Sequence, residues 1–123
     1  MQILFEAQPY SSVSTDAVVA YVFGDKEASI EGPIAELDRS VGGKIKPLAD
    51  SSELTGKPLE MVLIHYPQGL AAKKLLLVGA GKPAKFSHAE LRKIAGAALG
   101  YLRSRGVKSF AFLVGENERT PAA

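Results

Sequence analysis

Two continuous apolar runs constrain the fold of this chain more than any other feature of its sequence. Residues 15–23, TDAVVAYVF, and residues 74–78, KLLLV, carry an apolar side chain at nearly every position rather than at alternate positions. A strand that is apolar on both faces is typical of a sheet covered by helices on both sides. The two runs therefore predict an α/β fold.

Two helical patterns lie between the predicted strands. Residues 33–43 open with a proline, place apolar side chains at helical spacing and end on a pair of glycines. Further along, Ser87 and Glu90 form an S-x-x-E capping box ahead of an apolar stripe through residues 91–102. Gly106 then supplies the left-handed residue that commonly ends a helix. We therefore expect two helices of different length.

Three further segments have the composition of strands, namely residues 2–6, 59–66 and 107–114. The short link between 59–66 and 74–78 predicts a hairpin, whereas the long helix before 107–114 predicts that this strand runs parallel to 74–78. Residues 44–58 read as a polar connection with helical fragments. Together the elements predict a mixed, mostly parallel sheet with helices on both faces.

The composition limits the class of protein. A chain of 123 residues matches one domain, and the absence of cysteine excludes disulfides and thiolate metal sites. No segment approaches 18 consecutive apolar residues, and the first residues lack a basic signal-peptide region. We expect a soluble cytoplasmic protein with no membrane partner.

The net charge of +2 conceals an asymmetry between the halves of the chain. Residues 1–60 carry 5 Lys/Arg against 10 Asp/Glu, a net of −5, and residues 61–123 carry 10 against 3, a net of +7. Such a basic half is compatible with an acidic partner or with nucleic acid. Because its basic residues are spaced out without interleaved aromatic residues, a solvated helix and its loops are the preferred interpretation.

A glycine motif follows the second apolar run. Gly79, Gly81 and Ala84 formally satisfy the G-x-G-x-x-G/A dinucleotide pattern, which makes Gly79, Gly81 and Lys82 candidates for a nucleotide-binding loop. A phosphate-binding loop must lead directly into a helix, yet a proline lies inside this motif and the capping box starts the helix only at Ser87. The preferred interpretation is that the glycines permit a tight exit from a buried strand.

No other group of residues forms a catalytic or metal-binding pattern. His65 and His88 lack a second histidine at helical spacing, so neither predicts a zinc site. Asp16 precedes a strand, and Glu36 and Asp38 point to different faces of a predicted helix, so solvated surface is the better interpretation of all three. The residues alone predict no catalytic residue and no metal ligand.

The order of these signals resembles a known family. A Thr-Asp-Ala-Val strand at residues 15–23 precedes a helix with Glu-Leu-Asp and a Gly-Gly pair at residues 34–43. A Leu-Leu-Leu-Val-Gly-x-Gly-Lys strand at 75–82 and an Ala-rich helix at 89–102 follow. In this order and spacing, the segments resemble the N-terminal domain of the leucyl (cytosol) aminopeptidases over nearly the whole chain.

The resemblance implies a three-layer α/β/α sandwich like the macro domains, formed by residues 1–115, with residues 116–123 as a linker or a truncated end of the domain. The parent would be a two-metal exopeptidase that uses zinc or manganese and releases N-terminal amino acids. The family's catalytic Asn-Thr-Asp-Ala-Glu-Gly-Arg stretch appears nowhere in these 123 residues. The chain by itself is therefore expected to lack enzymatic activity and any cofactor of its own.

The resemblance also implies partners. The domain would pack against a C-terminal catalytic domain and neighbouring subunits of a homo-hexamer, and it would help to enclose the active-site cavity. DNA is a further partner that the resemblance allows, since some family members use this domain to bind it. The alternative is a stand-alone macro-like module that binds ADP-ribose or another nucleotide near residues 79–82.

Overall fold

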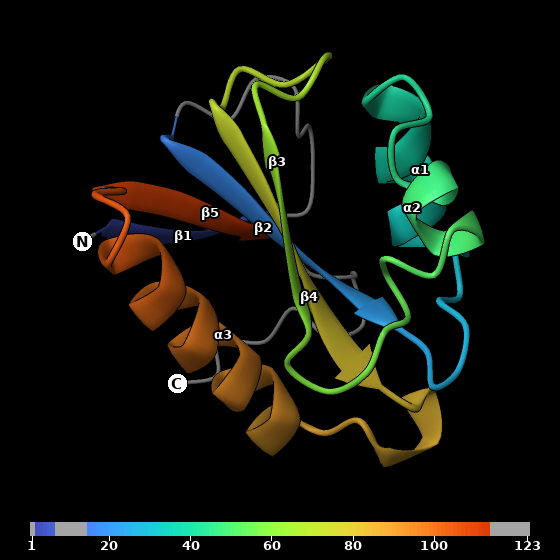
Figure 1. Cartoon of the computed structure of the whole chain (residues 1–123). Helices are drawn as coiled ribbons and strands as arrows, with labels where there is room; N and C mark the ends of the chain where they lie inside the picture. The colour runs from blue at the N-terminus through green and yellow to red at the C-terminus, as the bar shows by residue number, and fades with distance from the viewer. Residues whose placement is uncertain (1, 7–14, 114–123) are drawn as a thin grey trace.

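A five-stranded sheet forms the middle of the molecule (Figure 1). The computed structural model describes residues 2–6 and 15–113. Four strands are parallel and one edge strand is antiparallel, which confirms the predicted mixed, mostly parallel sheet. In spatial order the strands are β1 (Gln2–Glu6), β5 (Ser109–Leu113), β2 (Ala17–Phe23), β4 (Lys74–Gly81) and β3 (Met61–His65).

The strand neighbours follow the predictions in one place and extend them in another. β3 and β4 form the predicted antiparallel hairpin. β4 and β5 are parallel as predicted, but β2 lies between them and pairs with both. The central place of β2 agrees with its composition, since residues 17–20 and Val22 are all buried. A strand that is apolar on both faces gains most when it is paired along both edges and covered on both sides.

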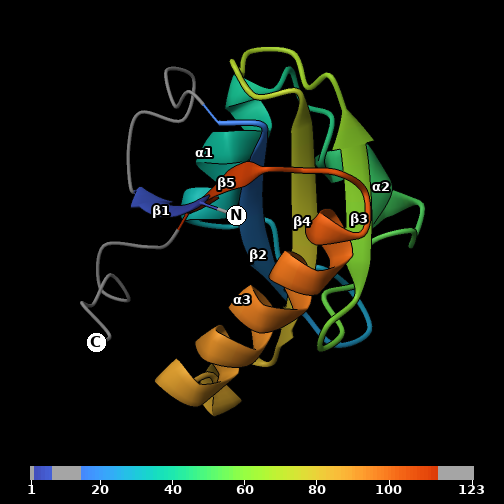
Figure 2. The same cartoon turned by 90° about the vertical axis from the view of Figure 1, so that its left-hand side faces the viewer.

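Helices cover both faces of the sheet, which confirms the three-layer α/β/α arrangement (Figure 2). The long helix α3 (His88–Arg103) lies on one face, and the short helices α1 (Pro33–Ser40) and α2 (Lys46–Asp50) lie on the other. Alternate residues of β2 face opposite layers: Val18 packs into the core below α1, whereas Val19 packs into the core below α3.

Local signals define both ends of α3. At its start, the Ser87 side chain accepts a hydrogen bond of 3.4 Å from the amide of Glu90, as the capping box predicts. At its end, Gly106 has a φ of +77°, and the amide of Val107 donates to the carbonyl of Leu102 over 3.1 Å. This left-handed glycine and the backward hydrogen bond are the features of a Schellman motif, so the predicted stop is confirmed.

The glycine motif lies inside a strand, which differs from the prediction of a loop after residue 78. β4 continues through Gly79 to Gly81, and a 3₁₀ turn at Pro83–Lys85 precedes α3. Residues 55–60, here named the strap, supply the reason. The strap runs along the end of β4 and satisfies its backbone groups, so the strand does not end where its apolar side chains end.

The prediction of a linker or truncated domain end at residues 116–123 lies outside the described residues. Among the helices of the described residues, none has the length and apolar composition that crossing a membrane requires.

Candidate functional site

The strap and the glycines meet at the carboxyl ends of β2 and β4. A Cβ atom on Gly79 would overlap the carbonyl oxygen of Lys57, and a Cβ atom on Gly56 would come within 2.6 Å of the Gly24 backbone. Such distances are shorter than a side-chain carbon tolerates, so three segments approach one another backbone to backbone. Glycine at these positions is explained by the close approach of the chain to itself.

The backbone amides of the nucleotide-loop candidates already donate hydrogen bonds within the domain. The amide of Gly79 donates to the carbonyl of Glu60 over 2.7 Å, and that of Gly81 donates to the carbonyl of Gly56 over 2.8 Å. The exposed Lys82 ammonium lies 3.7 Å from a carboxylate oxygen of Asp25. Phosphate binding by Gly79 and Gly81 stays a prediction, and it requires the strap to leave these amides first.

Glu60 holds the strap in its bent conformation. One of its carboxylate oxygens accepts from the amides of Thr55, over 2.8 Å, and Gly56, over 2.9 Å. The other accepts from the Thr55 hydroxyl over 2.9 Å. Partial burial raises the pKa of Glu60, but these hydrogen bonds and the nearby Lys57 ammonium outweigh it, so the net pKa lies below the ordinary value. The bent conformation of the strap is therefore most stable when the Glu60 carboxyl is ionised.

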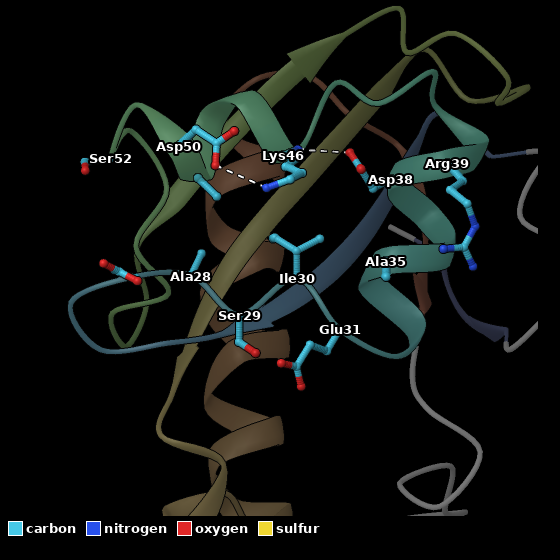
Figure 3. Close-up of a pocket in the computed structure, with 12 residues that line it drawn as sticks. Ala28, Ser29, Ile30, Glu31, Ala35, Asp38, Arg39, Lys46, Asp50 and Ser52 are labelled. Atoms are coloured by element: carbon cyan, nitrogen blue, oxygen red, sulfur yellow. Dashed lines mark hydrogen bonds and ion pairs between the residues drawn. The ribbon is translucent and has the colours of Figure 1, made fainter.

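A groove of about 760 Å³ opens on the α1 and α2 side of the sheet (Figure 3). It lies between the two short helices and the segment that follows β2 (Figure 3). Its lining combines an apolar floor with charged side chains of both signs, and carboxylates outnumber cations four to two. The lining residues are Glu27, Ala28, Ser29, Ile30, Glu31, Ala35, Asp38, Arg39, Lys46, Ala49, Asp50 and Ser52.

Two of the four carboxylates in this groove are used by the fold. Asp38 Oδ1 accepts hydrogen bonds from the amides of Ile45, over 2.8 Å, and Lys46, over 3.0 Å, and so caps the first turn of α2 (Figure 3). Asp50 pairs with the Lys46 ammonium at 3.3 Å, with both side chains about two-thirds exposed. The groove is thus a mildly acidic surface, and among its described lining residues no nucleophile is held against a base.

A smaller hollow of about 320 Å³ lies at the amino-terminal ends of the central strands. Lys73, Lys74 and Lys108 line it together with Asp16. Asp16 Oδ2 accepts a 3.0 Å hydrogen bond from the Lys108 amide, so this carboxylate joins the start of β2 to the start of β5. The three lysines place part of the basic half of the chain at this end of the sheet.

The other residues considered from the sequence lie apart. His65 ends β3 and His88 begins α3, and both side chains are exposed. Among the described residues, no three histidine, cysteine, aspartate or glutamate side chains lie close enough to hold a metal ion. Asp16 and Asp38 were interpreted as solvated surface, but both accept hydrogen bonds from backbone amides.

Sequence reasoning did not find the roles of Asp38 and Glu60. Each binds amides that lie four to eight residues away along an irregular segment. Neither residue occupies the N-cap position of a helix, and no periodic pattern marks such a contact. The only signal in the sequence is the cluster of turn-forming residues at 50–58, which indicates a bend without showing what holds it.

Comparison with known proteins identifies the relatives of the chain. Residues 18–123 match the family model described as the cytosol aminopeptidase family, N-terminal domain. The chain is 35% identical over 114 residues to a probable cytosol aminopeptidase of Solibacter usitatus, covering 93% of this chain and 21% of the relative. It is 34% identical over 97 residues to the cytosol aminopeptidase of Haemophilus influenzae, covering 79% of this chain and 19% of the relative.

Solved structures show the same fold. A mutant tomato leucine aminopeptidase aligns with a TM-score of 0.64 at 18% identity, covering 91% of this chain and 22% of that chain. The macrodomain of Mycobacterium tuberculosis DarG also aligns with a TM-score of 0.64, at 17% identity, covering 98% of this chain and 82% of that chain. The likeness to a macrodomain confirms the predicted fold class.

The sequence matches decide the family, since at these low identities the structural matches show the fold alone. The chain spans about a fifth of the length of the aminopeptidases that it matches. The matched model covers residues 18–123, which is most of the chain, and it describes the first domain of those enzymes. The chain therefore belongs to the cytosol aminopeptidase family and corresponds to its N-terminal domain.

Proposed function

We propose that this chain is a non-catalytic assembly domain of a cytosol aminopeptidase. It packs against a C-terminal catalytic domain and neighbouring subunits, in a homo-hexamer, and helps to enclose the active-site cavity. The observation that carries the proposal is the match of residues 18–123 to the N-terminal domain alone. The chain covers 21% of the Solibacter usitatus relative, and the proposal assigns the peptidase chemistry to the part that it does not cover.

The chemistry of the described residues is consistent with the proposed non-catalytic role. The resemblance to the family implies a parent with zinc or manganese, but the described residues bring no three metal-ligating side chains together. The carboxylates of Asp38 and Glu60 accept hydrogen bonds from backbone amides. In this proposal, metal binding and peptide hydrolysis belong to the catalytic domain.

A domain exchange tests the proposal. The N-terminal domain of the Solibacter usitatus relative is replaced by this chain, and a second version of that relative has no N-terminal domain. We expect the chimera to recover the native assembly by light scattering and to hydrolyse a leucyl peptide. The version without the domain is expected to form smaller assemblies and to lose turnover. Equal mass and equal turnover of the two versions would contradict the proposal.

The nucleotide-binding alternative is supported by one observation, the likeness of the fold to a macrodomain over 98% of this chain. Gly79, Gly81 and Lys82 would be its first contacts, after release of the strap. A thermal-shift titration with ADP-ribose tests it, because a ligand at 100 times its Kd adds roughly 2.7 kcal/mol of stability. An unchanged melting temperature with ADP-ribose and with every other nucleotide screened in the same way would exclude this alternative.

A further inference from the structure

The edge strand β3 lacks the features that protect most sheet edges. Its sequence, MVLIH, contains no lysine, proline or acidic residue, and β3 pairs only with β4 among the described strands. Figure 2 shows it along one margin of the sheet, on the side opposite to β1. The side chains of Met61 to Ile64 are all half-buried. An unprotected, apolar edge is a template for pairing with another strand.

Alternation along the hairpin decides which backbone groups face outward. The Tyr66 amide donates to the Lys73 carbonyl over 2.6 Å, and the Glu60 carbonyl accepts from the Gly79 amide over 2.7 Å. Between residues 60 and 66, the backbone groups of the even-numbered residues are therefore the ones that face β4. In an antiparallel ladder the intervening residues turn their amides and carbonyls to the other side. Met61, Leu63 and His65 therefore present their backbone groups to the open edge.

Two exposed apolar side chains flank this edge. Among the described residues, Leu59 and Tyr66 are the large hydrophobic residues left exposed, at 46% and 78%. Leu59 lies two residues before β3 and Tyr66 directly follows it, and both have left-handed backbones, with φ of 63° and 51°. A non-glycine residue holds this conformation only where its surroundings require it, and such residues gather at functional surfaces. Both exposed large hydrophobic residues of the described part of the chain therefore flank β3.

Among the described strands, the one at the opposite edge, β1, is separated from β3 by three other strands. Residues 114–123, VGENERTPAA, combine three charged side chains with a proline, a composition that is depleted in strands. A second β3 has the opposite character, because it is uncharged from Met61 to Ile64 and matches the length of the edge.

We infer that β3 pairs with β3 of a second copy of this chain in antiparallel orientation, which joins the two sheets into one. This interface deepens the assembly role and rests on it. With the twofold axis at Leu63, the two Leu63 residues exchange backbone hydrogen bonds, and Met61 of each copy lies opposite His65 of the other. Both ends of the new ladder then cover Leu59 and Tyr66 surface that is exposed in one copy. Such an interface is self-complementary, as a twofold contact requires.

Amide hydrogen exchange of the unmodified chain tests the pairing directly. As the protein concentration rises, the amides of Met61, Leu63 and His65 are expected to slow by roughly tenfold or more. The amides of Val62 and Ile64 are bonded to β4 in every copy, so they serve as internal controls with little change. A chain that stays monomeric at all concentrations, or a dimer without protection at the three outward amides, would overturn the inference.

A charge exchange at the opposed positions provides the second test. One variant carries Met61→Lys with His65→Lys, and the other carries Met61→Glu with His65→Glu. Each variant alone places like charges opposite each other and is expected to be monomeric by light scattering. An equal mixture places opposite charges together and is expected to restore the dimer mass. Failure of the mixture to pair, with both variants folded by circular dichroism, would also overturn the inference.

Controls separate this interface from other effects. Ala84→Lys with Ala89→Lys adds two positive charges at exposed positions away from β3, and this variant is expected to dimerise like the unmodified chain. Should a β3 variant fail to fold, the exchange measurement on the unmodified chain still decides. The domain-exchange experiment reports separately on the assembly role, since the pairing experiments contain no catalytic domain.

Discussion

The two faces of the sheet are similarly apolar but are covered in different ways. One face meets a single helix, α3, of 16 residues with local signals at both ends. A ring cluster extends this side, where Tyr21 stacks on Phe86 at 5.1 Å and Phe23 meets Phe86 edge-on at 5.1 Å. The other face meets α1 and α2, of 8 and 5 residues, and an open groove remains between them.

The difference shows two ways to close a core. On the α3 side, side chains of one regular element fill the space, so stability resides in packing. On the α1 and α2 side, short helices and the strap are held by carboxylates that bind amides, and by glycines that let backbones approach. This second layer depends on a few polar contacts.

The largest contrast is expected between two leucines. Leu102 of α3 is fully buried, whereas Leu48 of α2 is only half-buried. Leu102→Ala removes packed methyl groups and leaves a cavity, which is expected to lower the free energy of unfolding by about 3–4 kcal/mol. Leu48→Ala is expected to cost about 1–2 kcal/mol because its site is open to solvent. Urea unfolding measures both, and equal losses would contradict the contrast.

The next effect concerns the glycine contact. Gly79→Ala forces a Cβ atom into the carbonyl of Lys57, so the strap must shift, at an expected cost of about 3 kcal/mol in urea unfolding. Gly96→Ala is the matched control, because Gly96 lies within α3 with nothing near its Cβ position. The control is expected to gain about 0.5–1 kcal/mol. A neutral Gly79→Ala would show that the strap is not tightly packed.

A smaller loss is expected at the cap of α2. Asp38→Ala removes the acceptor for the amides of Ile45 and Lys46, and should cost about 1 kcal/mol of unfolding free energy in thermal or urea melts. Asp50→Ala breaks only the exposed pair with Lys46, and should change stability by less than about 0.5 kcal/mol. If the two variants lose the same amount, the cap does not hold α2.

The smallest effect is a change in the acid side of the stability profile. Because the folded pKa of Glu60 lies below its ordinary value, this carboxyl stabilises the fold above the unfolded pKa. That contribution is lost as the pH falls from the unfolded pKa through the lower folded one. Glu60→Gln should therefore lower the melting temperature at neutral pH and flatten its fall in acid. An unchanged slope between the two proteins would argue against this role.

The same contrast explains what could be predicted from the sequence. The capping box at Ser87, the stripe of α3 and the apolar run of β2 are local signals, and the structure confirms the elements they predict. The conformation of the layer on the other face could not be predicted from the sequence. There, α2 and the strap are held by contacts of Asp38, Glu60 and the glycines. Those contacts join irregular segments to each other, and no local pattern encodes them.

The predicted end of β4 shows the same limit. The apolar run stops at Val78, but the strand continues because the strap pairs with Gly79 and Gly81. The pairing order of the strands was likewise open, since the sequence shows which segments are strands but not that β2 separates β4 from β5. Fold class and family follow from the order of elements, while the candidate site depends on contacts between distant segments.

The place of β1 has a consequence for synthesis on the ribosome. β1 is the first strand to be translated, yet among the described strands it pairs only with β5, the last one. Its residues therefore leave the exit tunnel about a hundred residues before their partner exists. During that interval β2, β3 and β4 can associate. The edge of β2 that pairs with β5 in the folded domain has no partner strand until β5 is synthesised. Since Ser109–Leu113 pairs with both β1 and β2, the strand pairing of β1 can form only after this segment has been synthesised.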